Sequence, residues 1–143
     1  MDIIQTLLSA AKIAHVSGTL LVAICSHESM DFQLNYVAHD MGSPSFGVCQ
    51  LKEFSARQMG FKGVASDLNK PEINAHYAAL YLSYQQKRYG EDWLLLVGAY
   101  NAGSYLPNED GCPKNMKYIR LVQEKLPEDL KPRLDCDVIP ENE

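Results

Sequence analysis

One segment of this chain is apolar on every side of the helix it would form. It runs from Trp93 to Tyr100 with the sequence WLLLVGAY. A helix without a polar face is stable only when it is buried all round. Asp92, directly before the segment, is a typical N-cap because its carboxylate can accept hydrogen bonds from the free N–H groups of a first turn. The segment therefore predicts the central buried helix of a helical domain.

Most of the remaining chain also has helical patterns. Asp2 is the expected cap of a first helix that ends at Ser17-Gly18, and Thr19 is the expected cap of a second. Pro71 suits the first turn of a longer helix, where its missing N–H is not needed. That helix is expected to end at Gly90, with Ile73, Tyr77, Leu80, Tyr81 and Tyr84 as its apolar stripe. Residues 31–45 are expected to be a loop, residues 46–59 short helical turns, and residues 114–126 a final helix.

Length and composition limit the number of domains. A chain of 143 residues can bury about two thirds of its unfolded surface, which is enough for one core. We expect a single all-α domain over residues 1–126. Residues 127–143 are rich in proline and acidic residues, which predicts a C-terminal tail.

Charge and hydropathy argue against several functional classes. The net charge of −5 gives no basic face for nucleic acid, so no nucleic-acid partner is expected. Membrane insertion is not expected either, because no apolar run approaches roughly 20 residues. The N-terminus has no basic region followed by an apolar core and a cleavage site, so we expect no signal peptide. The four histidines lack metal-ligand spacing, and neither a metal nor another cofactor is expected.

The four cysteines show no C-x-x-C pair. Cys25 and Cys49 lie in apolar contexts and are expected to be buried thiols that pack as small hydrophobic side chains. Cys112 and Cys136 flank the least regular part of the chain. Two states are open for these two residues, a disulfide in an oxidising compartment or free thiols.

Glu28 is the strongest candidate for a catalytic residue. It follows the apolar stretch Leu20–Cys25, near the end of the second predicted helix. Partial burial of a carboxylate favours its protonated form and suits it to donate a proton near neutral pH. The alternative is an ordinary surface glutamate in the last turn of an amphipathic helix.

Two downstream segments favour the catalytic interpretation of Glu28 over that of a surface glutamate. They are Ser43–Gln50, with the sequence SPSFGVCQ, and Val97–Gly103, with the sequence VGAYNAG. Together with Glu28-Ser29, and in this order, they resemble the three sequence blocks of the lytic transglycosylases, whose fold is that of goose-type lysozyme. The resemblance covers roughly residues 20–122. It implies an all-α, lysozyme-like domain with a substrate cleft.

The resemblance also implies a reaction. Glycosidases of the usual kind need two carboxylates, whereas lytic transglycosylases use one glutamate, here Glu28, as acid and then as base. Their substrate is peptidoglycan, cut at the β-1,4 bond between N-acetylmuramic acid and N-acetylglucosamine. The C6 hydroxyl of the muramic acid attacks its own C1 and leaves a 1,6-anhydro end. Glycan strands of peptidoglycan are therefore the expected partner.

Other positions match the family residue by residue. The matching substrate-site residues are Ser29, Gln50, Tyr100, Asn101 and Tyr118. Ser29 is expected to be a hydrogen-bonding support, Gln50 to lie in the cleft or brace its loop, and Asn101 to be largely structural. Two positions depart from the family pattern. Lys114-Asn115 replaces a Glu-Thr pair before Tyr118, and Val48-Cys49 replaces a block that usually contains methionine.

Two alternative functions are open. Asp40-Met41-Gly42 is similar to the goose-type lysozyme pattern, in which an aspartate holds a water for hydrolysis, so a muramidase with Glu28 and Asp40 is one alternative. Asp40 as a turn residue beside Gly42 is the simpler interpretation. The other alternative is a noncatalytic glycan-binding or virion module. The intact set of Glu28, Gln50 and Tyr100 argues against it.

The predicted place of action is the bacterial cell wall in the periplasm. Since no signal peptide is recognised, a phage product, as a virion or lysis protein, is the favoured origin. Delivery by a secretion machine and a signal removed from the given chain are the alternatives. Other virion or secretion-system proteins are then further partners. Exo or endo cleavage, the peptide-stem preference and the oligomeric state are not predicted.

Overall fold

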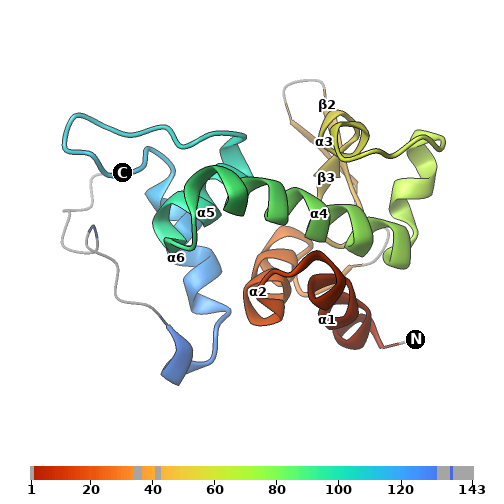
Figure 1. The fold of residues 1–143 in the computed structure, drawn as a ribbon, viewed down its shortest axis with the longest axis horizontal. Coiled ribbons are helices and arrows are strands. Elements are labelled where there is room, and N and C mark those ends of the chain that lie inside the picture. Colours follow the sequence, from red (N-terminus) through yellow and green to blue (C-terminus); the bar gives the residue numbers. More distant parts are fainter. Residues whose placement is uncertain (1, 34–36, 41–42, 132–135, 137–143) are drawn as a thin grey trace. The chain divides into compact units, whose positions relative to one another are not determined.

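The computed structural model describes residues 2–33, 37–40, 43–131 and 136 (Figure 1). The chain divides into two compact units, Met1–Tyr84 and Gln85–Glu143. The boundary falls inside helix α4 (Pro71–Tyr89), which contributes residues to both units. Helices dominate the described chain, which confirms the predicted all-α class. The division into a domain of residues 1–126 and a tail of residues 127–143 stays a prediction.

The first unit begins with two helices that pack against each other, α1 (Ile3–Ala14) and α2 (Gly18–Glu28). Asp2 caps α1, as predicted, by accepting a hydrogen bond from the Ile4 N–H at 2.9 Å. The prediction that Thr19 caps α2 was wrong. Ser17 is the cap, because it has an extended backbone and its Oγ accepts from the Leu20 N–H at 3.1 Å. Gly18 therefore starts α2 and does not end α1.

A small antiparallel sheet follows, in a region that was expected to be loop and helical turns. Its strands are β1 (Val37–Asp40), β2 (Ser43–Phe46) and β3 (Leu51–Lys52), in the order β1-β2-β3. The strands have only two to four residues, which is too short for the alternating pattern that identifies a strand in a sequence. They are held by pairing, with Val37 opposite Phe46 and Phe46 opposite Leu51.

Helix α3 (Glu53–Gln58) and the 3-10 helix η1 (Ala65–Asn69) connect the sheet to α4. The buried side of α4 is made of small residues, Ala75, Ala78 and Ala79, with Leu82. The expected tyrosine stripe is only partly buried, since Tyr81 is 6% exposed while Tyr77 and Tyr84 are half-buried. Alanines at helical spacing let neighbouring backbones approach closely, so the helix face with the smaller side chains forms the core.

The second unit is built on α5 (Trp93–Ala102) and α6 (Met116–Glu124), which contact each other. Asp92 caps α5 as predicted, with its carboxylate accepting from the Leu94 N–H at 2.9 Å. The second half of α5 is buried, from Leu96 to Tyr100. The 3-10 helix η2 (Glu128–Leu130) follows α6.

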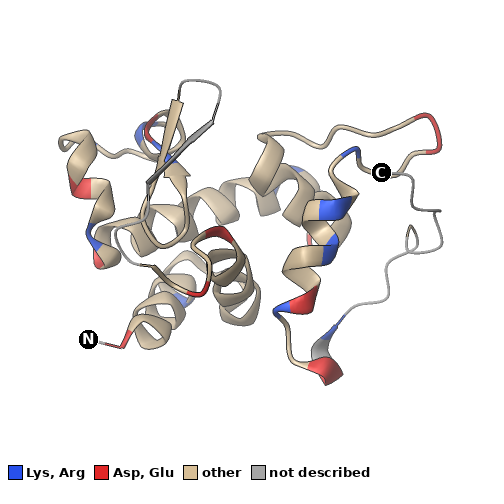
Figure 2. Ribbon diagram, turned by 180° about the vertical axis from the view of Figure 1, so that it is seen from behind, with Lys and Arg blue, Asp and Glu red and all other residues tan. Residues whose placement is uncertain are grey.

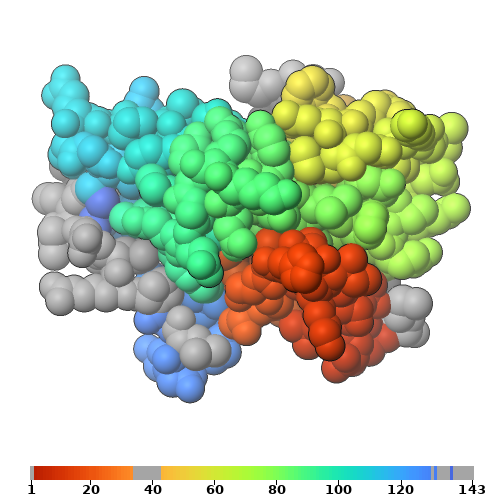
Figure 3. All heavy atoms as spheres, in the orientation of Figure 1, coloured from red at the N-terminus to blue at the C-terminus, as the bar shows by residue number. Residues whose placement is uncertain are grey.

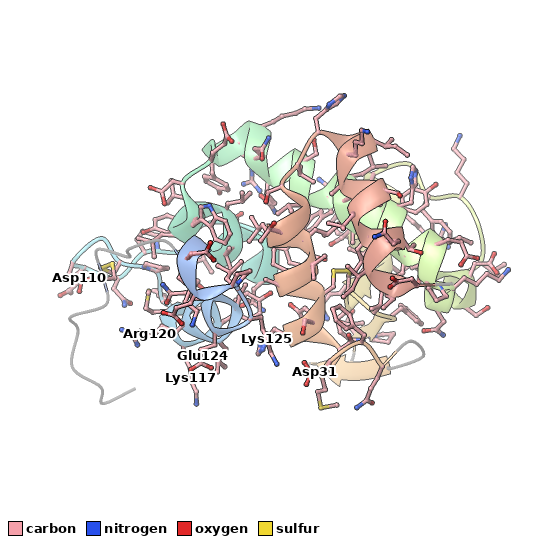
Figure 4. All side chains as sticks on the ribbon, turned by 90° about the horizontal axis from the view of Figure 1, so that it is seen from below. Asp31, Asp110, Lys117, Arg120, Glu124 and Lys125 are labelled. Atoms are coloured by element: carbon pink, nitrogen blue, oxygen red, sulfur yellow. A yellow bond between two sulfur atoms is a disulfide. The ribbon has the colours of Figure 1, made fainter. Side chains whose placement is uncertain are left out.

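Two disulfides stabilise the chain, one in each unit (yellow bonds in Figure 4). Cys112 and Cys136 form one, so of the two states left open by the sequence, a disulfide or free thiols, the structure has the disulfide. The backbone carbonyl of Cys136 also accepts a hydrogen bond from Arg120 of α6 at 3.2 Å. Cys136, which lies in the predicted tail, is thus attached to the second unit at two points.

On the surface of the described residues, α6 carries basic side chains, and several large apolar side chains are exposed. Basic residues follow one another along α6 (Figure 2), where Lys117 and Arg120 are labelled in Figure 4. Helix α1 lies on the face of the molecule seen in Figure 3, and Ile4 and Ile13 on this helix are 41% and 68% exposed. In the described ranges, no helix has the length and apolar character needed to span a bilayer.

Candidate active site

Glu28 is the last residue of α2 and is half-buried. The helix before it is buried along most of its length, with Leu20, Leu21 and Ile24 at most 1% exposed. The buried helix fixes the backbone of Glu28, and its position at the helix end leaves the residue partly exposed. Acidic residues are visible at this end of α2 and in the loop after it (Figure 2).

Ser29 holds the end of α2 and the start of the next loop. Its side chain is fully buried, donates a hydrogen bond to the Cys25 carbonyl at 2.8 Å and accepts one from the Phe32 N–H at 3.1 Å. Both bonds are internal to the protein, which accords with the supporting role expected for this serine. The loop needs support, because Met30, Asp31 and Phe32 all have left-handed backbones, with φ of 50°, 63° and 69°.

Asp31 is tied back to the same helix. Its Oδ1 accepts a hydrogen bond from the Ser26 hydroxyl at 3.1 Å, and its N–H donates to the Ser26 carbonyl at 2.8 Å. Figure 4 labels Asp31 on the loop that follows α2. The three left-handed residues are therefore fixed by hydrogen bonds at both Ser26 and Ser29. Strained backbone of this kind persists only where its surroundings determine it.

Cys25 and Cys49 form the second disulfide, with Cα atoms 4.2 Å apart. The expectation of two buried thiols was wrong, although both residues are indeed 0% exposed. The two cysteines come from segments that pack together in the core, which the sequence alone does not reveal. Cys25 lies one helical turn before Glu28, and Cys49 directly precedes Gln50. The bridge therefore links the first motif block to the second.

Gln50 ends a tight turn that follows β2. It has a left-handed backbone, with φ of 49°, and is half-buried. Its side-chain Nε2 donates to the Gly47 carbonyl at 2.8 Å, and its backbone N–H donates to the same oxygen at 3.1 Å. Bracing of the loop, one of the two roles expected for Gln50, is thus present. Its role toward substrate stays a prediction.

Asn74 of α4 holds this turn from the core side. Its side chain is 0% exposed, and its Oδ1 accepts from the Cys49 N–H at 2.8 Å. Its Nδ2 donates to the carbonyls of Phe46 and Leu68, both at 2.7 Å. One buried amide therefore makes hydrogen bonds to three backbone groups from two separate segments of the chain, Phe46–Cys49 and Leu68.

The third motif block forms the end of α5 in the second unit. Tyr100 is 6% exposed, and the helix ends at Gly103, whose φ of 88° suits glycine. Gln85, fully buried at the end of α4, donates to the carbonyls of Ala99 at 3.2 Å and Gly103 at 3.1 Å. Arg88 adds a bond to the Gly103 carbonyl at 2.8 Å. This end of α5 is thereby held by side chains of the preceding helix.

Asn101 and Asn115 connect α5 with the start of α6. The Nδ2 of Asn115 donates to Asn101 Oδ1 at 2.9 Å and to the Gly98 carbonyl at 3.0 Å. A structural role for Asn101, as expected, agrees with this contact. Asn115 stands where the family pattern has a different residue, and it supplies this link in the present chain. Tyr118 lies one turn further along α6 and is half-buried.

The candidate residues divide between the two units. Glu28, Ser29 and Gln50 belong to the first, where the disulfide joins their segments. Tyr100, Asn101 and Tyr118 belong to the second. Asp40 ends β1 with its backbone opposite Ser43. Its side chain lies outside the described part of the structure, so its role in holding water stays a prediction.

Sequence reasoning missed three amides that hold the motif blocks, Asn74, Gln85 and Asn115. Asn74 and Gln85 lie among the mostly apolar inward residues of α4, and Asn115 lies directly before α6. A polar amide in such a position is a usable indication of a buried hydrogen-bonding residue. Which backbone groups it serves depends on contacts across 14 to 28 residues, and no local pattern encodes them.

One titratable group with a perturbed pKa lies in the second unit. Burial raises the pKa of the Tyr105 phenol, and the negative charges of Asp92 and Asp110 raise it further. The Tyr105 hydroxyl donates to the Gly111 carbonyl and so braces the loop between α5 and α6.

Among the described residues, no group of three acidic, histidine or cysteine side chains is placed to hold a metal ion.

Comparison with known proteins identifies the relatives of this chain. The model of the transglycosylase SLT domain family matches residues 5–111. Protein IpgF of Shigella sonnei and protein IpgF of Shigella flexneri are each 30% identical to the chain over 92 residues. Each match covers 63% of this chain and 60% of the relative, so the chain spans less than two thirds of their length.

A solved structure shares the fold. It is the X-ray structure of the lytic transglycosylase Slt, inactive mutant E503Q, from Pseudomonas aeruginosa, with a TM-score of 0.62 and 22% sequence identity. The match covers 87% of this chain and 20% of that protein. The likeness confirms the lysozyme-like fold expected from the three motif blocks. Because the family model covers most of the chain, this protein belongs to the transglycosylase SLT domain family.

Proposed function

We propose that this protein is a peptidoglycan lytic transglycosylase in which Glu28 is both the general acid and the general base. The observation that carries the proposal is the link between the first two motif blocks. Glu28 ends a buried helix that the Cys25–Cys49 disulfide joins to the turn containing Gln50. Membership of the SLT family supports the same activity.

The proposed reaction needs no second carboxylate. Glu28 donates its proton to the oxygen of the β-1,4 bond between N-acetylmuramic acid and N-acetylglucosamine, and the C1–O bond breaks. The ionised Glu28 then takes the proton of the muramic acid C6 hydroxyl while that oxygen bonds to C1. The products are an anhydro end and a free 4-hydroxyl, and Glu28 is returned to its protonated form.

The other candidates take supporting roles in this proposal. Gln50 and Tyr100 contact the substrate, Ser29 holds the end of α2 that carries Glu28, and Asn101 holds the end of α5 that carries Tyr100. Tyr118 is proposed as a further substrate contact from α6. Asp40 enters the reaction only if hydrolysis is observed.

We further propose that the protein acts in an oxidising compartment, where peptidoglycan is accessible. Two disulfides support this, because such bonds persist in the periplasm or outside the cell and are rare in a reducing cytosol. Delivery by a phage or by a secretion machine stays a prediction, as do partners from either source.

The test is a digestion of purified peptidoglycan with the wild-type protein and with Glu28→Gln. The released muropeptides are analysed by mass spectrometry before and after borohydride reduction. We expect products that lack one water and resist reduction, formed only by the wild type. Glu28→Gln keeps the size of the side chain but has no proton to donate as an acid.

Two other outcomes would replace the proposal. Reducible muramic acid ends would indicate a muramidase, and Asp40→Asn would then be the next variant. Binding to peptidoglycan by both proteins without any released product would indicate a noncatalytic glycan-binding module.

A further inference from the structure

We propose that Asn74 is a positioning residue for Gln50, and that it acts on the turn between β2 and β3. The inference rests on the proposed function, since it assigns Gln50 a place beside the substrate. Asn74 lies on α4, 24 residues beyond Gln50 in the sequence, and belongs to none of the three motif blocks.

Asn74 contacts the turn at both ends, through the carbonyl of Phe46 at 2.7 Å and the N–H of Cys49 at 2.8 Å. Gly47 lies between these two points. Its carbonyl receives both the side-chain and the backbone hydrogen bonds of Gln50. The orientation of that carbonyl, and with it the direction of the Gln50 side chain, is therefore set by the amide of Asn74.

The turn has no spare room on the side of Asn74. A Cβ added to Gly47 would lie 2.7 Å from Asn74 Nδ2 and 2.8 Å from the Leu68 carbonyl. Both distances are shorter than Cβ atoms normally approach other heavy atoms. A side chain at position 47 would therefore push the turn and the Asn74 amide apart. Gly47 is thus required by its φ of 74° and by the close approach of Asn74.

Gln50 itself needs this support. Its left-handed backbone is unfavourable for a residue other than glycine and persists only where neighbouring contacts determine it. The Cys25–Cys49 disulfide fixes the preceding residue on one side, and Asn74 fixes the turn on the other. If the amide is lost, the turn keeps the covalent link but loses the hydrogen bonds that define its direction.

The first test compares Asn74→Leu with Leu82→Ala. Leucine has nearly the size of asparagine but no hydrogen bonds, while Leu82 is fully buried on the same helix and its side chain has no hydrogen-bonding group. Both variants are expected to lower the melting temperature. Initial rates are measured well below both melting temperatures on soluble glycan strands prepared from peptidoglycan. We expect Asn74→Leu to lower kcat by about tenfold or more, and Leu82→Ala to keep it near wild type.

The second test perturbs the same contact from the opposite side, in case Asn74→Leu does not fold. Gly47→Ala forces a Cβ against the Asn74 amide, whereas Gly90→Ala adds a Cβ at φ of 75° with nothing within 4 Å. The backbone strain is therefore similar in the two variants, and only Gly47→Ala disturbs Asn74. Gly47→Ala is expected to lower kcat, and Gly90→Ala to lower only the stability.

A spectroscopic measurement completes the test without relying on activity. In ¹⁵N-labelled protein, the side-chain amide of Gln50 is expected to shift in Asn74→Leu and Gly47→Ala and to stay in place in Leu82→Ala and Gly90→Ala. A wild-type protein that releases no product would defeat the proposed function, but the Gln50 amide would still report on the positioning. The inference is overturned if folded Asn74→Leu keeps the Gln50 signal and kcat, or if the controls lose kcat equally.

Discussion

Asn115 donates a hydrogen bond of 2.9 Å to the side-chain oxygen of Asn101, and so joins the residue before α6 to the last turn of α5. The same amide reaches the Gly98 carbonyl at 3.0 Å. Space beside Gly98 is limited, because an added Cβ would lie 3.3 Å from Asn115 Oδ1. These contacts tie together the two helices of the second unit.

The hydrogen bond predicts coupling between the two asparagines. Asn115→Ala is expected to cost about 1–3 kcal/mol in unfolding free energy, because the Gly98 carbonyl and Asn101 Oδ1 both lose their donor. Asn101→Ala should cost less, since Asn101 is exposed. Urea unfolding of both single variants and the double variant measures the coupling, expected to be about 0.5–1.5 kcal/mol. Strict additivity would contradict the contact.

The two disulfides form a matched pair for testing the role of the bridge at the motif blocks. Both close loops between cysteines 24 residues apart, so chain entropy predicts the same stabilisation of about 3.5 kcal/mol for each. We expect similar losses of stability when either pair is replaced by alanine. Only loss of Cys25–Cys49 should also lower kcat on soluble glycan strands, measured below the melting temperature of both variants. Equal kcat in the two variants would show that the bridge does not position the site.

Ser29 provides a third prediction. Ser29→Ala removes the acceptor of the Phe32 N–H and the donor to the Cys25 carbonyl, so the free energy of unfolding should fall by about 1–3 kcal/mol. Hydrogen exchange of the Phe32 amide should speed up, because the left-handed loop loses its support. Ser9→Ala, at an exposed position of α1, is the control and should change neither quantity. Unchanged exchange at Phe32 in Ser29→Ala would refute the role assigned to Ser29.

The raised pKa of Tyr105 predicts a loss of stability in alkali. Because the folded protein holds the phenolic proton more tightly than the unfolded chain, the stabilisation is fully present below the ordinary tyrosine pKa of about 10. It is lost as the pH rises through the higher pKa of the folded state. Melting temperatures between about pH 8 and pH 12 should therefore fall more steeply for the wild type than for Tyr105→Phe. Parallel curves for the two proteins would exclude the effect.

Local chemistry made the helices predictable. Asp2 and Asp92 cap α1 and α5 because a carboxylate before an apolar helix satisfies free N–H groups, and Pro71 begins α4 because it needs no hydrogen bond there. Ser17, which we expected to end the first helix, caps α2 in place of Thr19, in line with the stronger N-cap preference of serine. The three motif blocks also predicted the family correctly.

Contacts between distant segments were beyond local patterns. The Cys25–Cys49 bridge and the Asn74 hydrogen bonds depend on α2, the turn after β2 and α4 coming together. The strands were missed because pairing, not residue preference, stabilises segments of two to four residues. Glu28 and Gln50 could therefore be proposed from their motif blocks, but the disulfide and the hydrogen bonds that hold their segments together could not be predicted.

The two disulfides also affect how the protein must be prepared. Synthesis in the reducing cytosol of an expression host would leave four thiols, and the segments carrying Glu28 and Gln50 would lose their covalent link. A failed activity assay on such material would describe the redox state of the preparation and say nothing about the chemistry of the site. Counting free thiols with a chromogenic reagent before any assay, with none expected in the oxidised protein, separates these two cases.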